Sequence, residues 1–226
     1  MNKHSILAVA EVVLDAEHAL RRAAETATDF SEVAASSLRL LDEAALDAFY
    51  AHHEERRNLY LRSAGEHLER VRNRSGVMND LGADLTRHLT TALNAIEQAG
   101  YELSRSTETN VRDSELQAPR TQIEILGGVV ALAHPLVNQI ARHAQHATES
   151  AGATDALILV DSRLRETGRE VNRADEGVWV MRSVIGHAQF RAHSSSALAG
   201  SLSYAPTHPL QPASETRKPG QPGIAI

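Results

Sequence analysis

Two apolar ladders, which step alternately by three and four residues, run through the second half of the chain. The first comprises Ile123, Leu126, Val130, Ala133, Val137, Ile140, Ala144 and Ala147. The second comprises Leu157, Val160, Leu164, Thr167, Val171, Ala174, Val178, Met181, Ile185, Ala188 and Ala192. A period of 3.5 residues keeps a narrow apolar stripe turned toward a neighbouring helix. The ladders therefore predict two long helices with coiled-coil-like heptad packing.

The first half of the chain carries three further helical patterns. Residues 5–27 follow similar spacing, and Asp29 with Glu32 three residues later resembles a capping box, so we expect a second helix to begin there. Phe30 also continues the earlier spacing, which leaves one bent helix as the alternative. The pair Ser75 and Gly76 is a helix stop signal, and a third pattern follows it. The sequence thus predicts an all-α fold of about five long helices.

Three segments between these patterns are predicted connections. Seven consecutive polar residues at 52–58 either face solvent within one helix or form a connection, and both possibilities stay open. Residues 104–118 are polar and aperiodic, and Pro119 suits the first position of the next helix. A short connection around Gly152 predicts an antiparallel pair of ladder helices. A continuous helix over 155–193 would extend about 58 Å, so we expect an elongated bundle.

The composition changes after His193. Segment 194–226 holds five of the seven prolines and few charged residues. Such a segment buries too little apolar surface to offset the entropy lost when it becomes ordered. We therefore expect a helical bundle or coiled-coil domain at 1–193 and a flexible tail, rich in Pro, Ser and Gly, at 194–226.

Charge and composition argue against several classes of protein. The net charge is −6 and is spread over the chain, so nucleic acid is not a favoured partner. Arginine outnumbers lysine 21 to 2, which indicates a GC-rich, bacterial coding sequence, and cysteine is absent. The N-terminal apolar run is interrupted by Glu11 and Asp15 and lacks the features of a secretory signal. We expect a cytoplasmic protein, or one exported without a conventional signal peptide.

The sequence contains few signs of chemistry. It has no glycine-rich phosphate loop, no Gly-x-Ser-x-Gly elbow and no His-Glu-x-x-His zinc motif. We therefore expect no enzyme, no cofactor and no small-molecule substrate. Weak candidates for metal binding are His143, His146 and Glu149, which are spaced three residues apart. We prefer the interpretation that these three residues form a solvated helix face.

Two features favour an alternative function at or across a membrane. Segment 123–141 is the most apolar part of the chain, as in the concealed helices of pore-forming toxins, although we prefer the interpretation that it is a buried central helix kinked at Pro135. Tyr50 and Glu54 match the Tyr-x-x-x-Asp/Glu pattern of helical substrates of type VII secretion systems. The Trp-x-Gly turn of those substrates is missing, and a match of five residues assigns no family.

The ladders and the missing catalytic motifs together favour a non-enzymatic scaffold or assembly protein. We expect it to act through helix–helix association with itself or with a protein partner. The alternative is an exported or membrane-active helical protein, of the secretion-substrate or pore-forming type. Because Trp179 adjoins a ladder position, we expect it in a core or an interface. The expected interface comprises Leu157, Val160, Leu164, Val171, Val178, Trp179, Met181 and Ile185.

Overall fold

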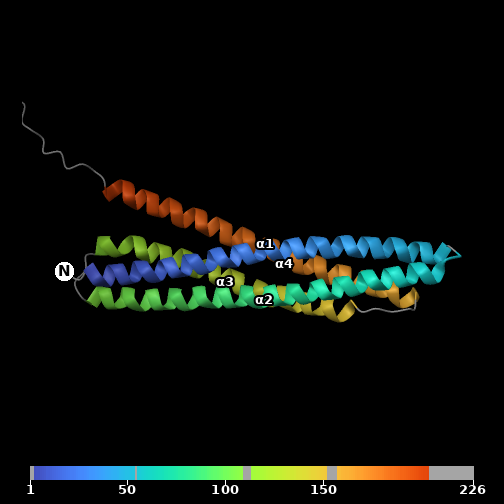
Figure 1. Ribbon diagram of the computed structural model, residues 1–226. Helices are drawn as coiled ribbons and strands as arrows, with labels where there is room; N and C mark the ends of the chain where they lie inside the picture. The colour runs from blue at the N-terminus through green and yellow to red at the C-terminus, as the bar shows by residue number, and fades with distance from the viewer. Residues whose placement is uncertain (1–2, 54, 109–112, 152–156, 204–226) are drawn as a thin grey trace, which may run out of the picture.

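Four long helices make up the fold in the computed structural model (Figure 1). The structure describes residues 3–53, 55–108, 113–151 and 157–203, and no strand occurs in these ranges. The helices are α1 (Lys3–His53), α2 (Arg57–Glu108), α3 (Asp113–Ser150) and α4 (Leu157–Ser203). The prediction of an all-α fold is confirmed. The expected number of five helices was wrong, because two of the predicted breaks lie inside continuous helices.

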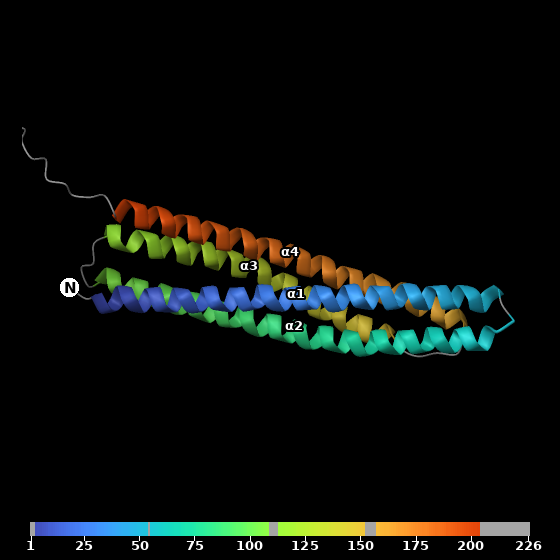
Figure 2. The ribbon, with the colours of Figure 1, turned by 45° about the horizontal axis from the view of Figure 1, so that its top comes forward.

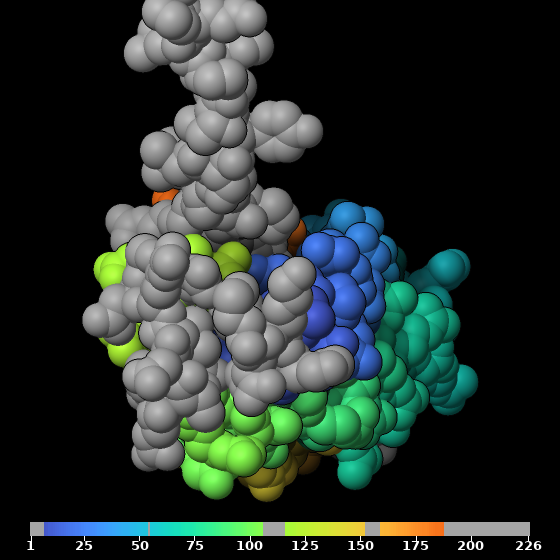
Figure 3. All heavy atoms as spheres, turned by 90° about the vertical axis from the view of Figure 1, so that its left-hand side faces the viewer, coloured from blue at the N-terminus to red at the C-terminus, as the bar shows by residue number. Residues whose placement is uncertain are grey.

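The helices alternate in direction and form an elongated antiparallel bundle (Figures 1 and 2). Each helix packs beside the next one along the chain, α4 also packs beside α1, and the diagonal pairs meet only slightly. This is the up-down-up-down arrangement of four-helix bundles. Its longest helix, α2, has 52 residues and therefore extends about 78 Å. Viewed along the bundle, α1 (blue) lies beside α2 (green to teal), the helix with which it packs most extensively (Figure 3).

The apolar ladders form the centre of this bundle. Among side chains that the structure describes, every ladder member is buried except Ile123 and Leu164, which are half-buried. The largest core cluster draws on all four helices and includes Leu20, Leu89 and Val178. Burying one such side chain stabilises a fold by about 1.5–3 kcal/mol relative to leaving it exposed. The stripes on the four helices therefore hold each other together.

A second core cluster closes the far end of the bundle. It is built from α1, α2, the start of α4 and Ala151, which directly follows α3, with Leu41, Leu68 and Val160 among its other members. Helix α3 has 38 residues and ends well short of the α1–α2 connection (Figure 2). Only three helices therefore enclose this cluster, whereas four enclose the rest of the core.

Tertiary burial explains why two predicted helix breaks are absent. Phe30 is fully buried inside α1, and the hydroxyl of Thr28 donates to the Ala24 carbonyl at 3.0 Å, so the helix continues past Asp29. Ser75 is likewise fully buried within α2. In both places the buried stripe continues on either side of the local signal. Packing therefore overrides local propensity, as it commonly does.

The connections also differ from the expected ones. The polar run at 52–58 contains a real connection, because α1 ends at His53 and α2 begins at Arg57. The predicted loop over 104–118 was wrong, since α2 continues to Glu108 and α3 begins at Asp113. Pro119 consequently lies inside α3, after the fully buried Leu116. The antiparallel pairing of the ladder helices is confirmed, although Gly152 itself lies outside the described residues.

Helix α4 continues beyond the expected boundary of the tail. It ends at Ser203, so the composition change at 193 does not mark the end of the helix. The remainder of the expected tail, 204–226, lies outside the described residues. The C-terminal part of α4 leans away from α1 in both ribbon views (Figures 1 and 2).

Two aromatic residues lie on the surface instead of in the core. Trp179 is 68% exposed, so of the two places expected for it, a core or an interface, the core is excluded and the interface stays a prediction. It belongs to α4, the helix that leans away from α1 toward its C-terminal end. Phe49 of α1 is 57% exposed, whereas Ala48 beside it occupies a buried position. Both are therefore available for contacts outside this chain.

Two glycines of α4 give a direct test of how tightly α3 and α4 pack. A Cβ atom at Gly177 would lie 2.8 Å from Cγ1 of Ile140, whereas a Cβ at Gly186 would meet nothing within 4 Å. We predict that Gly186→Ala raises the free energy of unfolding by about 0.5–1 kcal/mol through helix propensity. Gly177→Ala should instead lower it by about 1–3 kcal/mol, because Ile140 must move. Urea unfolding of both variants measures the difference, and an equal gain at both sites would contradict this packing.

Candidate functional site

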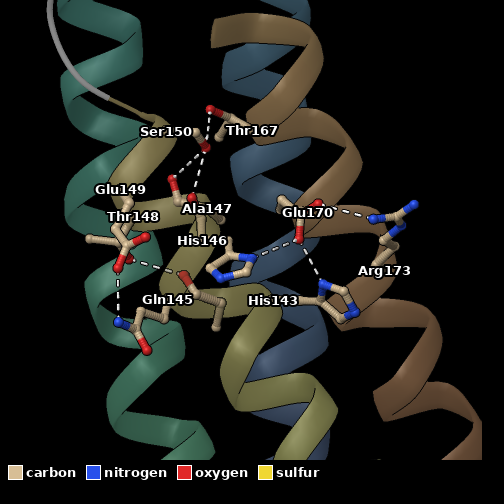
Figure 4. Close-up of polar contacts among 11 residues, drawn as sticks. His143, Gln145, His146, Ala147, Thr148, Glu149, Ser150, Thr167, Glu170 and Arg173 are labelled. Carbon is tan, nitrogen blue, oxygen red and sulfur yellow. Dashed lines mark hydrogen bonds and ion pairs between the residues drawn. The ribbon is translucent and has the colours of Figure 1, made fainter.

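A buried carboxylate joins α3 to α4 near the middle of the bundle. Glu170 of α4 is only 7% exposed. Its Oε2 atom accepts a hydrogen bond of 2.6 Å from Nδ1 of His143 on α3, and Nδ1 of His146 lies 3.7 Å from the same oxygen (Figure 4). Its Oε1 atom accepts a hydrogen bond of 3.2 Å from Arg173. We call these four residues the Glu170 cluster.

Helical spacing and the antiparallel pairing of two helices create this cluster. His143 and His146 are three residues apart on α3 and so lie on the same side of that helix. Glu170 and Arg173 have the same spacing on α4. Glu170 also directly precedes the buried ladder residue Val171, which places its carboxylate at the edge of the core. The two pairs meet because the helices run side by side in opposite directions.

The surroundings of Glu170 favour its charged form. Burial, the largest single influence, would on its own raise the pKa of this carboxyl group, whereas the hydrogen bond and positive charge of His143 lower it. Arg173 and His146 act in the same direction, so the pKa of Glu170 lies below its ordinary value of 4.5. The cluster therefore holds a carboxylate whose two oxygens are both occupied.

Further polar contacts continue beside the cluster. The hydroxyl groups of Ser150 and Thr167 lie 3.0 Å apart and join α3 to α4 (Figure 4). On the other side of α3, Nδ2 of Asn79 donates to the hydroxyl of Thr148 at 3.0 Å and joins α2 to α3. A polar layer thus crosses three helices where the core is rich in alanine. Such directional contacts fix the relative register of helices that small apolar residues fix only loosely.

The structure separates the three metal candidates. His143 and His146 face Glu170, whereas Glu149 lies elsewhere on α3 and accepts a hydrogen bond of 2.8 Å from Nε2 of Gln145. Within the described ranges, no group of three or more His, Cys, Asp or Glu residues is arranged to hold a metal ion. The nearest set is the two histidines with Glu170, and Arg173 already occupies the second oxygen of that carboxylate. The geometry fits a structural contact between helices.

Two grooves lie away from the Glu170 cluster. The first, of about 570 Å³, runs between α1 and α2, and two acids (Asp15 and Glu25) alternate along it with Arg21 and Arg22. The mixed charges give it no preference for one sign of ligand. Close to it, burial and the charge of Arg22 lower the pKa of His88, which favours the neutral imidazole.

The second groove is apolar and lies between α3 and α4. It has a volume of about 540 Å³, with Glu124 as its acidic residue. We call it the α3–α4 groove. Its other lining residues are Ile125, Gly128, Val129, Leu132, Val184 and His187.

Another apolar surface lies at the α1–α2 connection. Leu46, Phe49 and Tyr50 of α1 are 58%, 57% and 43% exposed, and the rings of Tyr50 and Tyr60 are 5.5 Å apart. We call these four residues the hairpin tip patch. Nearby, Nε2 of His52 lies 3.3 Å from Asp161 of α4, which attaches the start of α4 to the tip.

Sequence reasoning missed Glu170 and both apolar surfaces. The residue spacing along α3 drew attention to His143 and His146. It did not show which face of α4 lies opposite these two histidines. A weak signal was available, because Glu170 adjoins a buried ladder position and has an arginine three residues later. The expected interface residues Val160, Val171, Val178, Met181 and Ile185 are buried against the chain's own helices, as Leu164 is in part. The side chain of Leu157 lies outside the described set.

The Glu170 cluster predicts a stability difference that depends on pH. Glu170→Gln should lower the free energy of unfolding by about 1–3 kcal/mol at neutral pH, because it removes a charged partner of His143 and Arg173. The folded-state pKa is depressed, so this contribution exists above 4.5 and disappears as the pH falls through the folded pKa. Chemical unfolding across this pH range measures it.

The matched control is Glu149→Gln on the exposed face of α3. Its only described side-chain contact is the hydrogen bond with Gln145, so the change should stay within about 0.5 kcal/mol at every pH. Equal effects of the two substitutions would contradict the assignment of Glu170 as the carboxylate that joins the helices.

Comparison with protein-family models, curated proteins and solved structures gives no match for this chain.

Proposed function

We propose that this protein is a non-enzymatic helical assembly protein that associates with itself or with the helices of a protein partner. The single observation that supports this proposal is that large apolar side chains of α3 and α4 are exposed outside a well-filled core. Leu132 is 62% exposed and Trp179 is 68% exposed, although the ladder residues beside them are buried. Leu132 lines the apolar α3–α4 groove, and exposed apolar surface of this kind is typical of sites of protein association.

The distribution of charge along α3 and α4 supports the same proposal. Residues 125–141 of α3 contain no Asp, Glu, Lys or Arg, and Arg182 is the only such residue in 177–190 of α4. The outer surface of this part of the bundle therefore lacks the charged groups that normally keep a helix face in water. Low charge and high exposure together favour a contact with another protein.

The proposal extends to the way in which the ladders pack. Their spacing of three and four residues supports coiled-coil-like interdigitation within each chain. The ladder residues then maintain the bundle, and other residues make contacts between molecules. We therefore propose the exposed apolar side chains of α3 and α4, in place of the buried second ladder, as the interface. Of the residues first expected there, only Trp179 is exposed in the part of the chain that has described side chains.

A membrane-active function is the second candidate. The segment Leu116–Ser150 of α3 is long and apolar enough to cross a bilayer, with a mean hydropathy of 1.4 over its most apolar 18 residues, of which 33% are buried. The core helix of a soluble bundle meets the same criterion of length and composition. Flotation with liposomes at neutral and acid pH distinguishes the two functions. Protein that floats with vesicles favours the second, and protein that stays at the bottom at both pH values removes it.

Sedimentation across a range of concentrations tests self-association directly. One chain has a mass of 24.5 kDa, and we predict a rise toward a multiple of this mass as concentration increases into the range of roughly 1–100 μM. The rise in mass should be reversible on dilution, because a contact made by a few exposed apolar side chains is usually moderate in strength. A constant mass of 24.5 kDa throughout would contradict self-association.

A further inference from the structure

One surface of α3 combines a protruding side chain with a hollow on the same side of the helix. Leu132 is 62% exposed and lines the α3–α4 groove. Gly128 lies four residues earlier in the same groove, and a Cβ atom there would meet nothing within 4 Å. Residues four apart on a helix lie one above the other, about 6 Å apart along the axis. The groove therefore presents the protruding side chain of Leu132 (the knob) directly beside the open space at Gly128 (the hollow).

We propose that this face is a homodimer interface, in which α3 of one copy packs antiparallel against α3 of a second copy. The inference rests on the proposed function and names its partner and its surface. A two-fold axis between residues 128 and 132 places Leu132 of each copy over Gly128 of the other. A face with a knob and a hollow side by side is complementary to itself under such an axis.

The charges at the two ends of this face select the antiparallel direction. Glu124 and Arg142 are both exposed and flank the uncharged residues 125–141. With the axis between 128 and 132, Glu124 of one copy lies within about 9 Å, along the helix axis, of Arg142 in the other. A parallel pairing would instead set like charges against each other. Electrostatic complementarity of this kind fixes the orientation of an interface more than its strength.

The size of the face is sufficient for a weak, specific dimer. From Glu124 to Arg142 the helix extends about 27 Å, and two neighbouring helices present a width of about 20 Å. The product of length and width is a buried area of roughly 540 Å² for each copy, or about 1,100 Å² in total. This total lies at the lower end of the range of specific interfaces. Val184 and His187 of α4 contribute the second half of the width.

A pair of matched lysine substitutions tests the location of the interface. Leu132→Lys places a charge at the centre of the proposed contact and should raise the dissociation constant of the dimer at least tenfold, a change of about 1.4 kcal/mol. Leu46→Lys in the hairpin tip patch alters a leucine of nearly equal exposure, 58% against 62%, and should leave the constant unchanged. Circular dichroism and thermal unfolding confirm that both variants keep the fold.

The outcomes separate this inference from the proposed function. Weaker association of the Leu46 variant alone would overturn the α3–α4 location while self-association remained. A wild-type protein that is monomeric at all concentrations would contradict self-association itself and, with it, the dimer. The wild-type protein could also be monomeric and float with liposomes. If Leu132→Lys then abolishes flotation, the face binds a membrane and the dimer is overturned.

A charge exchange tests the antiparallel orientation. Glu124→Arg and Arg142→Glu should each weaken the dimer several-fold, since each places like charges near one another across the interface. The double variant restores opposite charges and should recover most of the wild-type dissociation constant. A double variant that associates more weakly than either single variant would overturn the proposed pairing.

Discussion

The burial of one narrow apolar stripe on each of four helices is the interaction on which the rest of the structure depends. No disulfide is possible in a chain without cysteine, and the aromatic residues are few. Stability therefore comes from many small aliphatic contacts distributed along the bundle. This explains why local stop signals have little effect: ending a helix at Asp29 or Ser75 would expose the buried side chains on both sides of the break.

Polar contacts have a different role in this bundle. Toward the end of α3 the stripe consists of Ala144, Ala147 and Ala151, which are all fully buried. Alanines let helices approach closely but allow them to slide, because their surfaces have little relief. The Glu170 cluster and the contact between Ser150 and Thr167 lie at this level, and they fix the register between α3 and α4. A charged group is retained in the core where shape alone specifies least.

The sequence predicted the helical class and the ladder positions from periodicity, and the pairing of the last two helices from the short connection between them. The sequence did not predict how one helix is placed against another. Phe49 and Trp179 each adjoin a buried position, Ala48 and Val178, and only the arrangement of the helices shows that they are exposed. The same holds for Glu170, whose partner lies 27 residues away on another helix. Periodicity identifies a face, but it does not identify what that face meets.

Helix α3 has two different apolar sides, one buried in its own bundle and one exposed, and we propose the exposed side as the contact with another molecule. Thiol labelling measures this directly, because a chain without cysteine accepts a single reporter. Ala144 is fully buried and Leu132 is 62% exposed. In dilute protein, a cysteine at Leu132 should react at the rate of a free thiol, whereas a cysteine at Ala144 should react only after unfolding. Equal labelling at the two positions would contradict the account.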